Sequence, residues 1–527
     1  MSNTDNIIPL KDELPSSFAD RLGVFYSSRV SDTHKKKFGQ FFTPVEIARF
    51  MANLSNSKKS RISILDPGCG TATLSCAMAE TLLKNNPRLS EIKLVAYETD
   101  SDLIALAEHS LSYLRKWLAK SKVRINYVLI KTDFILDNAD TLENQNREKI
   151  RYDIAISNPP YFKLQKSDER ASAVNLVVHG QPNIYSIFLY LAATLLENGG
   201  QVIFIVPRSF TSGFYFKLFR EKFFSQIQLN HIHLFGSRRD AFSRYEVLQE
   251  NVIISGKLRG QNGHRSRLAV SFSEGLKDLQ HTRATEFYSD ELLDMNSRQK
   301  ILYLPLNENE AEIIKLFRSW KGNLNKYNIQ VSTGPVVAFR AKKYICTQPQ
   351  NAISFAPLFW LHNIYKMKIS WPLNKDGKGE YIQIGTPSVS LLIPNKNYIF
   401  LRRFSAKDDR SRLIAAPYYS NASDSDFIGV ENHLNYIYRP NGHLEKNEML
   451  GLAALLNSTL FDAYFRTFNG NINVSATEIR GIPLPPIETI KGIGDALLFK
   501  SAFTQKEIDE VVNHFLTREK MEFVSYG

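Results

Sequence analysis

The stretch that decides the fold is ISILDPGCGTA, residues 62–72. It begins with a short apolar run, which is typical of a buried strand, and continues into a glycine-rich turn. Apolar residues then recur at helical spacing, at Leu74, Ala77, Met78 and Leu82. A strand, a glycine-rich turn and a helix in this order predict a nucleotide-type cofactor site, because glycine lets backbone and ligand approach closely. The turn carries Ala72 where a dinucleotide fingerprint has its third glycine, and it lacks the lysine of a phosphate-binding loop.

Two more apolar runs end in side chains that suit the same cofactor. Residues 93–97 are followed by Glu98, and residues 126–131 are followed closely by Asp133 and Phe134. Because ligands bind outside the carboxyl ends of the strands in an open α/β sheet, we expect these side chains to lie in one crevice. Glu98 is placed to accept hydrogen bonds from ribose hydroxyls, and Asp133 to accept one from an adenine amino group.

A fourth apolar run, residues 152–157, ends in the tetrapeptide Asn158-Pro159-Pro160-Tyr161. The two prolines end the strand and hold a rigid, extended turn. The side-chain oxygen of Asn158 and the carbonyl of Pro159 could accept the two hydrogens of an exocyclic amino group, while Tyr161 stacks on the ring that carries it. Taken alone, the tetrapeptide could equally be a loop that uses prolines as spacers. Four such strand ends in succession are a strong indication of an enzyme site.

With these motifs in this order, the chain resembles the S-adenosylmethionine-dependent adenine-N6 DNA methyltransferases. Residues 66–70 look like their first cofactor motif, and KFGQFFTP at 37–44 looks like the segment that covers the methionine end of the cofactor. The tetrapeptide at 158–161 matches their catalytic motif. The likeness is specifically to PstI- and BsuBI-type modification enzymes and covers most of the chain, continuing through residues 332–337, 402–407 and 470–478.

The resemblance implies a class I methyltransferase, with an α/β domain built on a Rossmann-like, mostly parallel seven-stranded sheet, plus a mixed α+β C-terminal domain. The apolar runs 231–235 and 251–255 are separated by a short loop, so we expect an antiparallel hairpin at the sheet edge. The polar residues 259–283 predict an irregular edge or linker. We expect a catalytic domain with a helical N-terminal lead-in, a target DNA recognition domain and a C-terminal helix, at residues 1–305, 306–500 and 501–527.

The resemblance also implies the roles of individual residues. Thr43 would contact the methionine carboxylate of the cofactor, Glu98 its ribose, and Asp133 its adenine. The whole expected cofactor set is Phe42, Thr43, Asp66, Gly68, Gly70, Glu98, Asp133, Phe134 and Asn158. The expected catalytic residues are Asn158, Pro159, Pro160 and Tyr161. The target base would stack on Tyr161 and also on Phe242, for which an ordinary core position is nearly as good an explanation.

The expected reaction is methyl transfer to the N6 amino group of adenine in duplex DNA. Methylation of carbon 5 of cytosine needs a cysteine nucleophile, which usually follows a proline. None of the three cysteines, Cys69, Cys76 and Cys346, lies in such a sequence. An exocyclic amine needs no covalent intermediate, and acceptors at its two hydrogens favour a tetrahedral nitrogen in the transition state. A base inside the duplex is out of reach, so it must first flip out of the helix.

The composition agrees with a DNA-binding enzyme. The 527 residues suggest two or three domains, and the formal charge of +13 points towards a polyanionic partner such as double-stranded DNA. The second half carries no catalytic constellation but interleaves basic residues with aromatic ones. Its expected DNA contacts are Arg340, Arg402, Arg403 and Lys407.

Other features bear on the cellular setting. The three cysteines lack metal spacing and suggest a reducing cytoplasm without disulfides. His231 and His233 share a strand face, but with no third ligand nearby an exposed or hydrogen-bonded pair is favoured over a metal site. The N-terminus is polar and acidic, unlike a signal peptide, and no apolar stretch approaches membrane-spanning length. We therefore expect a cytoplasmic protein without metal or membrane partner.

Other functions remain open at this point. Methyl transfer to a protein glutamine or to an amino group of RNA reuses the same tetrapeptide, although such enzymes lack the 37–44 segment. A nicotinamide oxidoreductase is disfavoured by the incomplete glycine fingerprint. A non-enzymatic DNA-binding scaffold has no need of Glu98, Asp133 and Asn158 at successive strand ends. We favour the modification enzyme of a type II restriction-modification system, and expect any cognate restriction endonuclease to act separately, because no long extra N-terminal region could house a fused nuclease.

Overall fold

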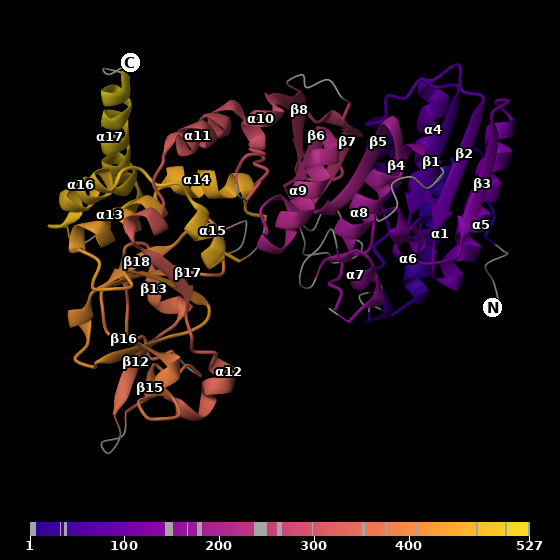
Figure 1. Cartoon of the computed structure of the whole chain (residues 1–527). Helices are drawn as coiled ribbons and strands as arrows, with labels where there is room; N and C mark the ends of the chain where they lie inside the picture. The colour runs from indigo at the N-terminus through magenta and orange to yellow at the C-terminus, as the bar shows by residue number, and fades with distance from the viewer. Residues whose placement is uncertain are drawn as a thin grey trace. The chain divides into compact units, whose positions relative to one another are not determined.

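The computed structural model forms two compact units, Met1–Leu306 and Asn307–Gly527 (Figure 1). It describes residues 7–524 apart from 32, 36–38, 143–150, 166, 176–181, 237–249, 261–265, 298, 350–353, 376, 406–408, 471–472 and 501–502. Among these described residues, no helix is long and apolar enough to cross a membrane.

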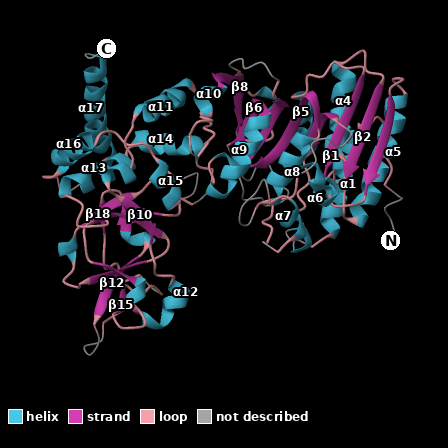
Figure 2. Cartoon of the chain, viewed as in Figure 1, coloured by secondary structure: helices cyan, strands magenta, loops and turns pink. Residues whose placement is uncertain are grey.

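A nine-stranded sheet organises the first unit (Figure 2), with the strand order β3-β2-β1-β4-β5-β7-β6-β8-β9. The strands are β1 (Arg61–Pro67), β2 (Glu91–Tyr97), β3 (Arg124–Ile130), β4 (Tyr152–Ser157), β5 (Leu196–Pro207), β6 (Ile227–Phe235), β7 (Asn251–Leu258), β8 (Arg267–Ser273) and β9 (Ala284–Tyr288). β1 to β5 run parallel, and β7 is antiparallel to both β5 and β6. The first seven strands thus have the predicted class I methyltransferase arrangement.

Two further strands correct the predicted edge of this sheet. β8 pairs in parallel with β6, and β9 pairs antiparallel with β8. The expected irregular linker over 259–283 is therefore wrong, and so is the edge position of the β6–β7 hairpin. Leu268 and Val270 of β8 are buried, so strand pairing and burial outweigh the low apolar content of this stretch.

Helices cover both faces of the sheet. α3 (Val45–Asn53), α4 (Thr73–Asn85) and α5 (Ser101–Ala119) share one apolar cluster with the strands, including Ile203 and Ile205 of β5. α8 (Ile184–Thr194) also packs on β5, whose alternate residues Val202 and Phe204 are buried as well. Burial on both faces explains why the central strands are continuous apolar runs. The unit further contains α1 (Pro15–Arg29), α6 (Phe134–Asn138), α7 (Glu169–Ala173), α9 (Lys217–Gln226) and α10 (Ser289–Leu292).

The N-terminal helix α1 fixes the segment 39–43. Phe42 packs into an apolar cluster with α1 and α5. The Tyr26 hydroxyl of α1 donates to the Asp100 carboxylate at 2.9 Å, and Gln40 Nε2 donates to the same oxygen at 2.9 Å. Because Asp100 caps α5 directly after β2, these bonds tie the segment to the carboxyl end of that strand.

The second unit is mixed α+β, as predicted. An antiparallel sheet has the order β10-β20-β17-β18, formed by β10 (Gln330–Thr333), β17 (Tyr398–Arg402), β18 (Ala415–Tyr418) and β20 (Leu434–Tyr438). A second sheet has the order β11-β15-β12-β19-β16, formed by β11 (Ile345–Cys346), β12 (Phe355–Phe359), β15 (Tyr381–Gln383), β16 (Leu392–Pro394) and β19 (Phe427–Val430). Its helices are α11 (Glu308–Ser319), α12 (Ala338–Ala341), α13 (Lys446–Asn457), α14 (Thr459–Phe468), α15 (Ala476–Gly481), α16 (Ile487–Leu497) and α17 (Gln505–Val524).

Candidate active site

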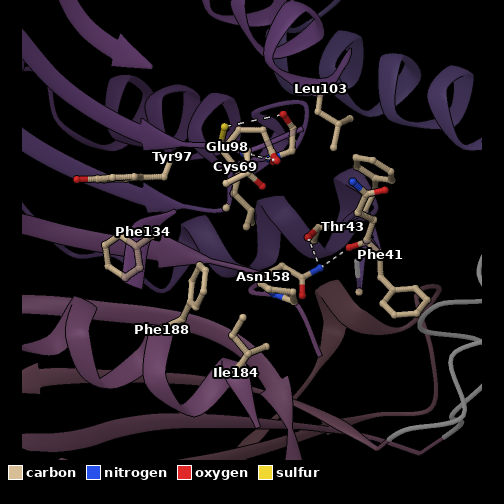
Figure 3. Close-up of a pocket in the computed structure, with 18 of the residues that line it drawn as sticks. Phe41, Thr43, Cys69, Tyr97, Glu98, Leu103, Phe134, Asn158, Ile184 and Phe188 are labelled. Atoms are coloured by element: carbon tan, nitrogen blue, oxygen red, sulfur yellow. Dashed lines mark hydrogen bonds between the residues drawn. The ribbon is translucent and has the colours of Figure 1, made fainter. Parts of the chain in front are cut away.

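One pocket lies at the carboxyl ends of β1, β2, β3 and β4 (Figure 3). Part of its wall is the segment 39–43, which α1 holds in place. The expected cofactor residues that line it are Phe42, Thr43, Gly68, Gly70, Glu98, Asp133, Phe134 and Asn158. Asp66 lies outside this lining, with a fully buried side chain (0% exposed). The structure therefore brings together residues that are more than a hundred positions apart in the sequence.

The glycine-rich turn after β1 depends on left-handed backbone conformations. Gly68 and Gly70 have φ angles of 74° and 57°, and Ala72, which precedes α4, has a φ of 64°. Glycine adopts this region freely, whereas an L-residue such as alanine is strained there by about 1–2 kcal/mol. A Cβ atom on Gly70 would lie 3.3 Å from the Phe42 ring. The turn and the 39–43 segment are therefore packed closely against each other.

Two carboxyl groups support this turn. The Glu98 carboxylate accepts from the Gly70 N–H at 3.0 Å and from two N–H groups of its own turn at 2.8 and 3.0 Å. Asp66 accepts from the Ser75 hydroxyl at 2.5 Å. Burial raises the pKa of both acids, that of Asp66 to about 7, with the neighbouring Glu98 adding to the rise. Three backbone N–H groups thus fix the Glu98 carboxylate, which lines the pocket.

Asp133 caps α6 and faces an arginine. Its Oδ1 accepts from the N–H groups of Ile135 at 2.8 Å and Leu136 at 3.1 Å. Its Oδ2 lies 3.6 Å from Nη1 of Arg170 in α7, which also pairs with Asp168 at 2.7 Å. Arg170 lines the pocket as well. The expected adenine-binding carboxylate therefore has a cationic neighbour inside the pocket.

Three aromatic rings, those of Tyr97, Phe134 and Phe188, lie together on one side of the pocket (Figure 3), and Asp133, which also lines the pocket, directly precedes Phe134 in the chain. The Phe134 ring packs against Tyr97 with a centroid distance of 5.1 Å and against Phe188 with one of 5.2 Å. All three residues line the pocket. A carboxylate next to an apolar aromatic wall suits a flat heterocycle that carries an amino group.

The 39–43 segment fixes the side chain of Asn158. Nδ2 donates to the carbonyl oxygen of Phe41 at 2.7 Å and to Oγ1 of Thr43 at 3.0 Å (Figure 3). The Tyr161 hydroxyl lies 2.5 Å from Oδ1 and 2.9 Å from the Ile205 carbonyl oxygen, two acceptors for its single hydrogen. Because a carbonyl oxygen can accept two hydrogen bonds, Oδ1 retains capacity for a further donor. The amide is thus held with its acceptor available on the pocket side.

Tyr161 lies outside the pocket lining, as does Pro159. Its ring is 7% exposed, faces Phe41 with a centroid distance of 6.4 Å and meets Tyr185 edge-on at 6.2 Å. Burial raises the pKa of its phenol well above the ordinary value, so the hydroxyl remains a donor at neutral pH. Pro160 of the same tetrapeptide lines the pocket. Phe242 and Lys407 lie outside the residues that the structure describes.

Comparison with known proteins places the chain in a family. Residues 44–242 match the family model described as Eco57I restriction-modification methylase. The chain is 31% identical to the type II methyltransferase M.PstI from Providencia stuartii over 508 residues, which covers 96% of this chain and 98% of that protein. This chain belongs to the type II methyltransferases. It is also 30% identical to the type II methyltransferase M.BsuBI from Bacillus subtilis, over 92% of this chain and 95% of that one.

Membership of this family and the class I fold make S-adenosylmethionine the cofactor of this type II methyltransferase. The pocket suits it, because it combines a glycine turn, two carboxylates at successive strand ends and a wall of aromatic rings. Any contact of a single residue with the cofactor remains a prediction. Bound there, S-adenosylmethionine supplies a methyl group on a positively charged sulfur.

Several pocket residues escaped the sequence analysis. Arg170 belongs to a five-residue helix in a polar stretch, and nothing in its neighbours along the chain indicates a pocket. Phe188 lies within the apolar helix α8, where its spacing looks like that of any core residue. Phe41 adjoins the expected residue Phe42, yet only the structure reveals that its carbonyl oxygen holds the Asn158 amide. Because a backbone atom makes this contact, the type of residue at position 41 does not indicate it.

The remaining expected residues lie elsewhere. Arg340, Arg402 and Arg403 belong to the second unit. In β6, His231 contacts Ser271 at 2.8 Å, and His233 contacts two serines of β8 at 2.9 and 3.0 Å, so both imidazoles are hydrogen bonded. Within the described parts of the chain, no group of three or more His, Cys, Asp or Glu side chains could hold a metal ion.

Proposed function

We propose that this type II methyltransferase transfers the methyl group of S-adenosylmethionine to the N6 amino group of adenine in duplex DNA. The observation that carries the proposal is the fixed Asn158 amide, whose Nδ2 donates to Phe41 and Thr43 while Oδ1, which faces the Tyr161 hydroxyl, can accept one further hydrogen bond. An acceptor without a basic group beside it suits an amine whose lone pair is conjugated into a ring. It holds the amine hydrogens without removing one of them.

In this proposal Asn158 and Pro159 act together on the amine. The Oδ1 of Asn158 and the carbonyl oxygen of Pro159 accept its two hydrogens, which favours a tetrahedral nitrogen with a localised lone pair. Tyr161 supports the base from one side, Phe242 contacts it from the other, and Pro160 keeps the turn rigid. The cofactor is held by Thr43 at its methionine end, Glu98 at the ribose and Asp133 at the adenine.

The cysteines argue against methylation of carbon 5 of cytosine. That reaction needs a thiolate nucleophile. Burial raises the pKa of the Cys69 and Cys76 thiols well above the ordinary value, and Cys346 belongs to the second unit. The resemblance to type II methyltransferases along almost the whole chain disfavours RNA or protein glutamine as the acceptor.

Recognition of the DNA sequence is assigned to the second unit. Three of its loops meet, because the Asn432 N–H donates to the Val336 carbonyl at 2.9 Å and the Arg403 N–H donates to the His433 carbonyl at 2.9 Å. We call residues 334–337, 403–405 and 431–433 the three-loop surface. Two of these loops contain motifs by which the sequence resembles PstI- and BsuBI-type enzymes.

The three-loop surface and the adjacent α12 combine cations with aromatic rings. The Arg403 guanidinium lies 5.6 Å from the Phe404 ring, and that of Arg340 lies 5.3 Å from the ring of the exposed Phe339. The His433 imidazole packs against Phe404 with a centroid distance of 4.8 Å. Cations that neutralise phosphates, next to rings that can stack, are the chemistry expected at a DNA interface.

We further infer that the enzyme acts in the cytoplasm and protects DNA against a restriction endonuclease that is a separate protein. Single-molecule sequencing of DNA from a methylation-free host that expresses the enzyme tests the whole proposal. N6-methyladenine at one defined sequence is the expected result. Methylated cytosine, or unmodified DNA from cells that contain the soluble enzyme, would overturn the proposal.

A further inference from the structure

Two large aromatic side chains stand in solvent on the segment that follows β5. Phe214 is 59% exposed and Tyr215 is 64% exposed. They are neighbours on a short 3-10 turn, Phe214–Phe216, that follows β5, and their rings meet edge-on with a centroid distance of 5.8 Å. Single exposed apolar residues are common on protein surfaces, but two adjacent exposed rings indicate a binding surface.

A buried arginine holds this turn in place. Arg220 of α9 is 0% exposed. Its Nη1 donates to the carbonyl oxygens of Phe210 at 2.9 Å and Gly213 at 2.8 Å, while Nη2 donates to that of Gln299 at 2.8 Å. Burial lowers the pKa of the guanidinium to about 10, so it is still charged at neutral pH. A buried cation bonded to two carbonyls directly before the turn, and to Gln299 elsewhere in the unit, fixes the backbone that carries the exposed rings, which lowers the entropy lost on binding.

Ring contacts connect the turn to the tetrapeptide. Phe216, the last residue of the turn, stacks on Tyr185 with a centroid distance of 5.5 Å. Tyr185 in turn meets Tyr161 edge-on at 6.2 Å. β5, which leads into the turn, pairs in parallel with β4, which leads into the tetrapeptide, through Ser157↔Phe204. Phe216, the chain neighbour of the exposed Tyr215, is therefore two ring contacts away from Tyr161, the side chain assigned to the target base.

We propose that Phe214 and Tyr215 insert into the DNA base stack next to the target adenine and stabilise the flipped state. This inference rests on the proposed function. Flipping leaves the neighbouring base pairs without a stacking partner, and apolar side chains that replace this partner are a known means of opening a duplex.

The position of the turn favours DNA over other occupants. The turn continues directly into Lys217, a cation placed to meet a phosphate beside an inserted ring. The chain carries a formal charge of +13, which favours a polyanion over a second copy of the same chain. Phe214 supplies a purely apolar face, and Tyr215 adds a hydroxyl that can contact a base edge or sugar.

The first experiment removes the rings. Full-length Phe214→Ala, Tyr215→Ala and the double variant are compared with wild type on a duplex that contains the sequence mapped by methylation sequencing. We expect kcat/KM for methyl transfer to fall by about 10- to 100-fold, the scale of a lost base–aromatic stack. Phe214→Trp should restore most of the rate. Val128→Ala on the edge strand β3, a residue that is 57% exposed in the same unit, is the matched control and should leave the rate unchanged.

A second duplex separates insertion from a structural role. In it the target adenine faces an abasic site, so the adenine is already unpaired and flipping requires little help. We expect the ring variants to recover most of the wild-type rate on this duplex. In the paired duplex, 2-aminopurine at the target position should fluoresce strongly with wild type and weakly with the double variant. Calorimetric affinity for S-adenosylmethionine should be the same for both proteins.

The outcomes are distinguishable. Ring variants that methylate the paired duplex at the wild-type rate would refute insertion and leave the proposed function intact. An equal loss of rate on both duplexes, together with a lower melting temperature, would show that the rings stabilise the protein itself. That result would also refute insertion. A wild-type enzyme that makes no N6-methyladenine on either duplex would refute the proposed function instead.

Discussion

At the scale of single residues, the site depends on one amide whose two ends have different tasks. The NH2 group of Asn158 donates to Phe41 and Thr43, and its oxygen, which already faces the Tyr161 hydroxyl, keeps room for one further donor from a ligand. The tetrapeptide alone indicated the acceptor, since Asn before Pro-Pro is visible in the sequence. The donor side could not be predicted, because one of its two partners is a backbone carbonyl in a segment 117 positions away.

Replacement of this amide gives a kinetic prediction. Asn158→Ala should lower kcat by about 100-fold or more, because it removes an acceptor that the transition state needs. Thr43→Val removes only one partner of Nδ2 and should lower kcat by less than about 10-fold. Single-turnover assays with saturating cofactor and DNA measure both. A larger loss of kcat in Thr43→Val than in Asn158→Ala would contradict the assigned roles.

The carboxylate of Asp133 gives a binding prediction. Asp133→Ala should weaken S-adenosylmethionine binding by about 1–3 kcal/mol, because a charge-assisted hydrogen bond to the adenine amino group is lost. Asp168→Ala removes the other partner of Arg170 without touching the pocket lining, so it should change the affinity much less. Isothermal titration calorimetry measures both affinities. Equal and small losses of affinity in both variants would show that Asp133 only caps α6 and does not bind the cofactor.

At the scale of elements, most strands that the sequence predicted, such as β1, β4 and β7, are buried on both faces, and residues of both faces are therefore apolar. β8 was missed because its serines and alanine resemble a linker. Two of those serines, Ser271 and Ser273, are needed in the strand as hydrogen-bond partners for His233 of β6. The same serines that make β8 look like a linker in the sequence therefore bond it to β6.

This attachment predicts a pH dependence of stability. Burial lowers the pKa of His233 from 6.5 to about 3. Between these two pH values the unfolded state binds more protons, so acidification below about pH 6.5 should reduce the free energy of unfolding, by up to about 1.4 kcal/mol per pH unit. Asp66, whose pKa is raised to about 7, acts in the opposite direction. The difference between wild type and His233→Asn in urea unfolding at several pH values isolates the histidine. Parallel pH profiles for the two proteins would contradict the prediction.

At the scale of the whole molecule, chemistry and DNA reading are assigned to different units. The pocket lies in the first unit, and the three-loop surface lies in the second. The sequence indicated basic and aromatic residues in the second half, but it could not distinguish exposed cations from structural ones. Arg402 Nε donates to the carbonyl of the buried Ile364 at 2.7 Å, and burial lowers its pKa, whereas Arg403 belongs to the three-loop surface, where its Nη1 donates to the Asn432 carbonyl at 2.9 Å.

This contrast predicts different behaviour for two adjacent arginines. Arg403→Ala should weaken DNA binding without changing cofactor affinity, and the loss of its bond to the Asn432 carbonyl, on a less buried loop, should lower the melting temperature less than the loss of Arg402 does. Arg402→Ala should lower the melting temperature, because a buried carbonyl loses its donor. Fluorescence anisotropy at several salt concentrations tests the first effect. The slope of the logarithm of the binding constant against the logarithm of the salt concentration should fall by about 1 if Arg403 contacts a phosphate. A loss of affinity confined to the cognate sequence would instead show that Arg403 reads a base. Unchanged DNA binding by Arg403→Ala would remove the three-loop surface from the interface.

Nucleoside mass spectrometry tests the central claim most directly. Duplex DNA is incubated with the purified enzyme and S-adenosylmethionine that carries a deuterated methyl group, then digested to nucleosides. We predict that the label appears in N6-methyldeoxyadenosine alone and disappears with Asn158→Ala. Label in any methylated cytosine, or equal labelling by the variant, would contradict the assignment of Asn158 to the adenine amino group.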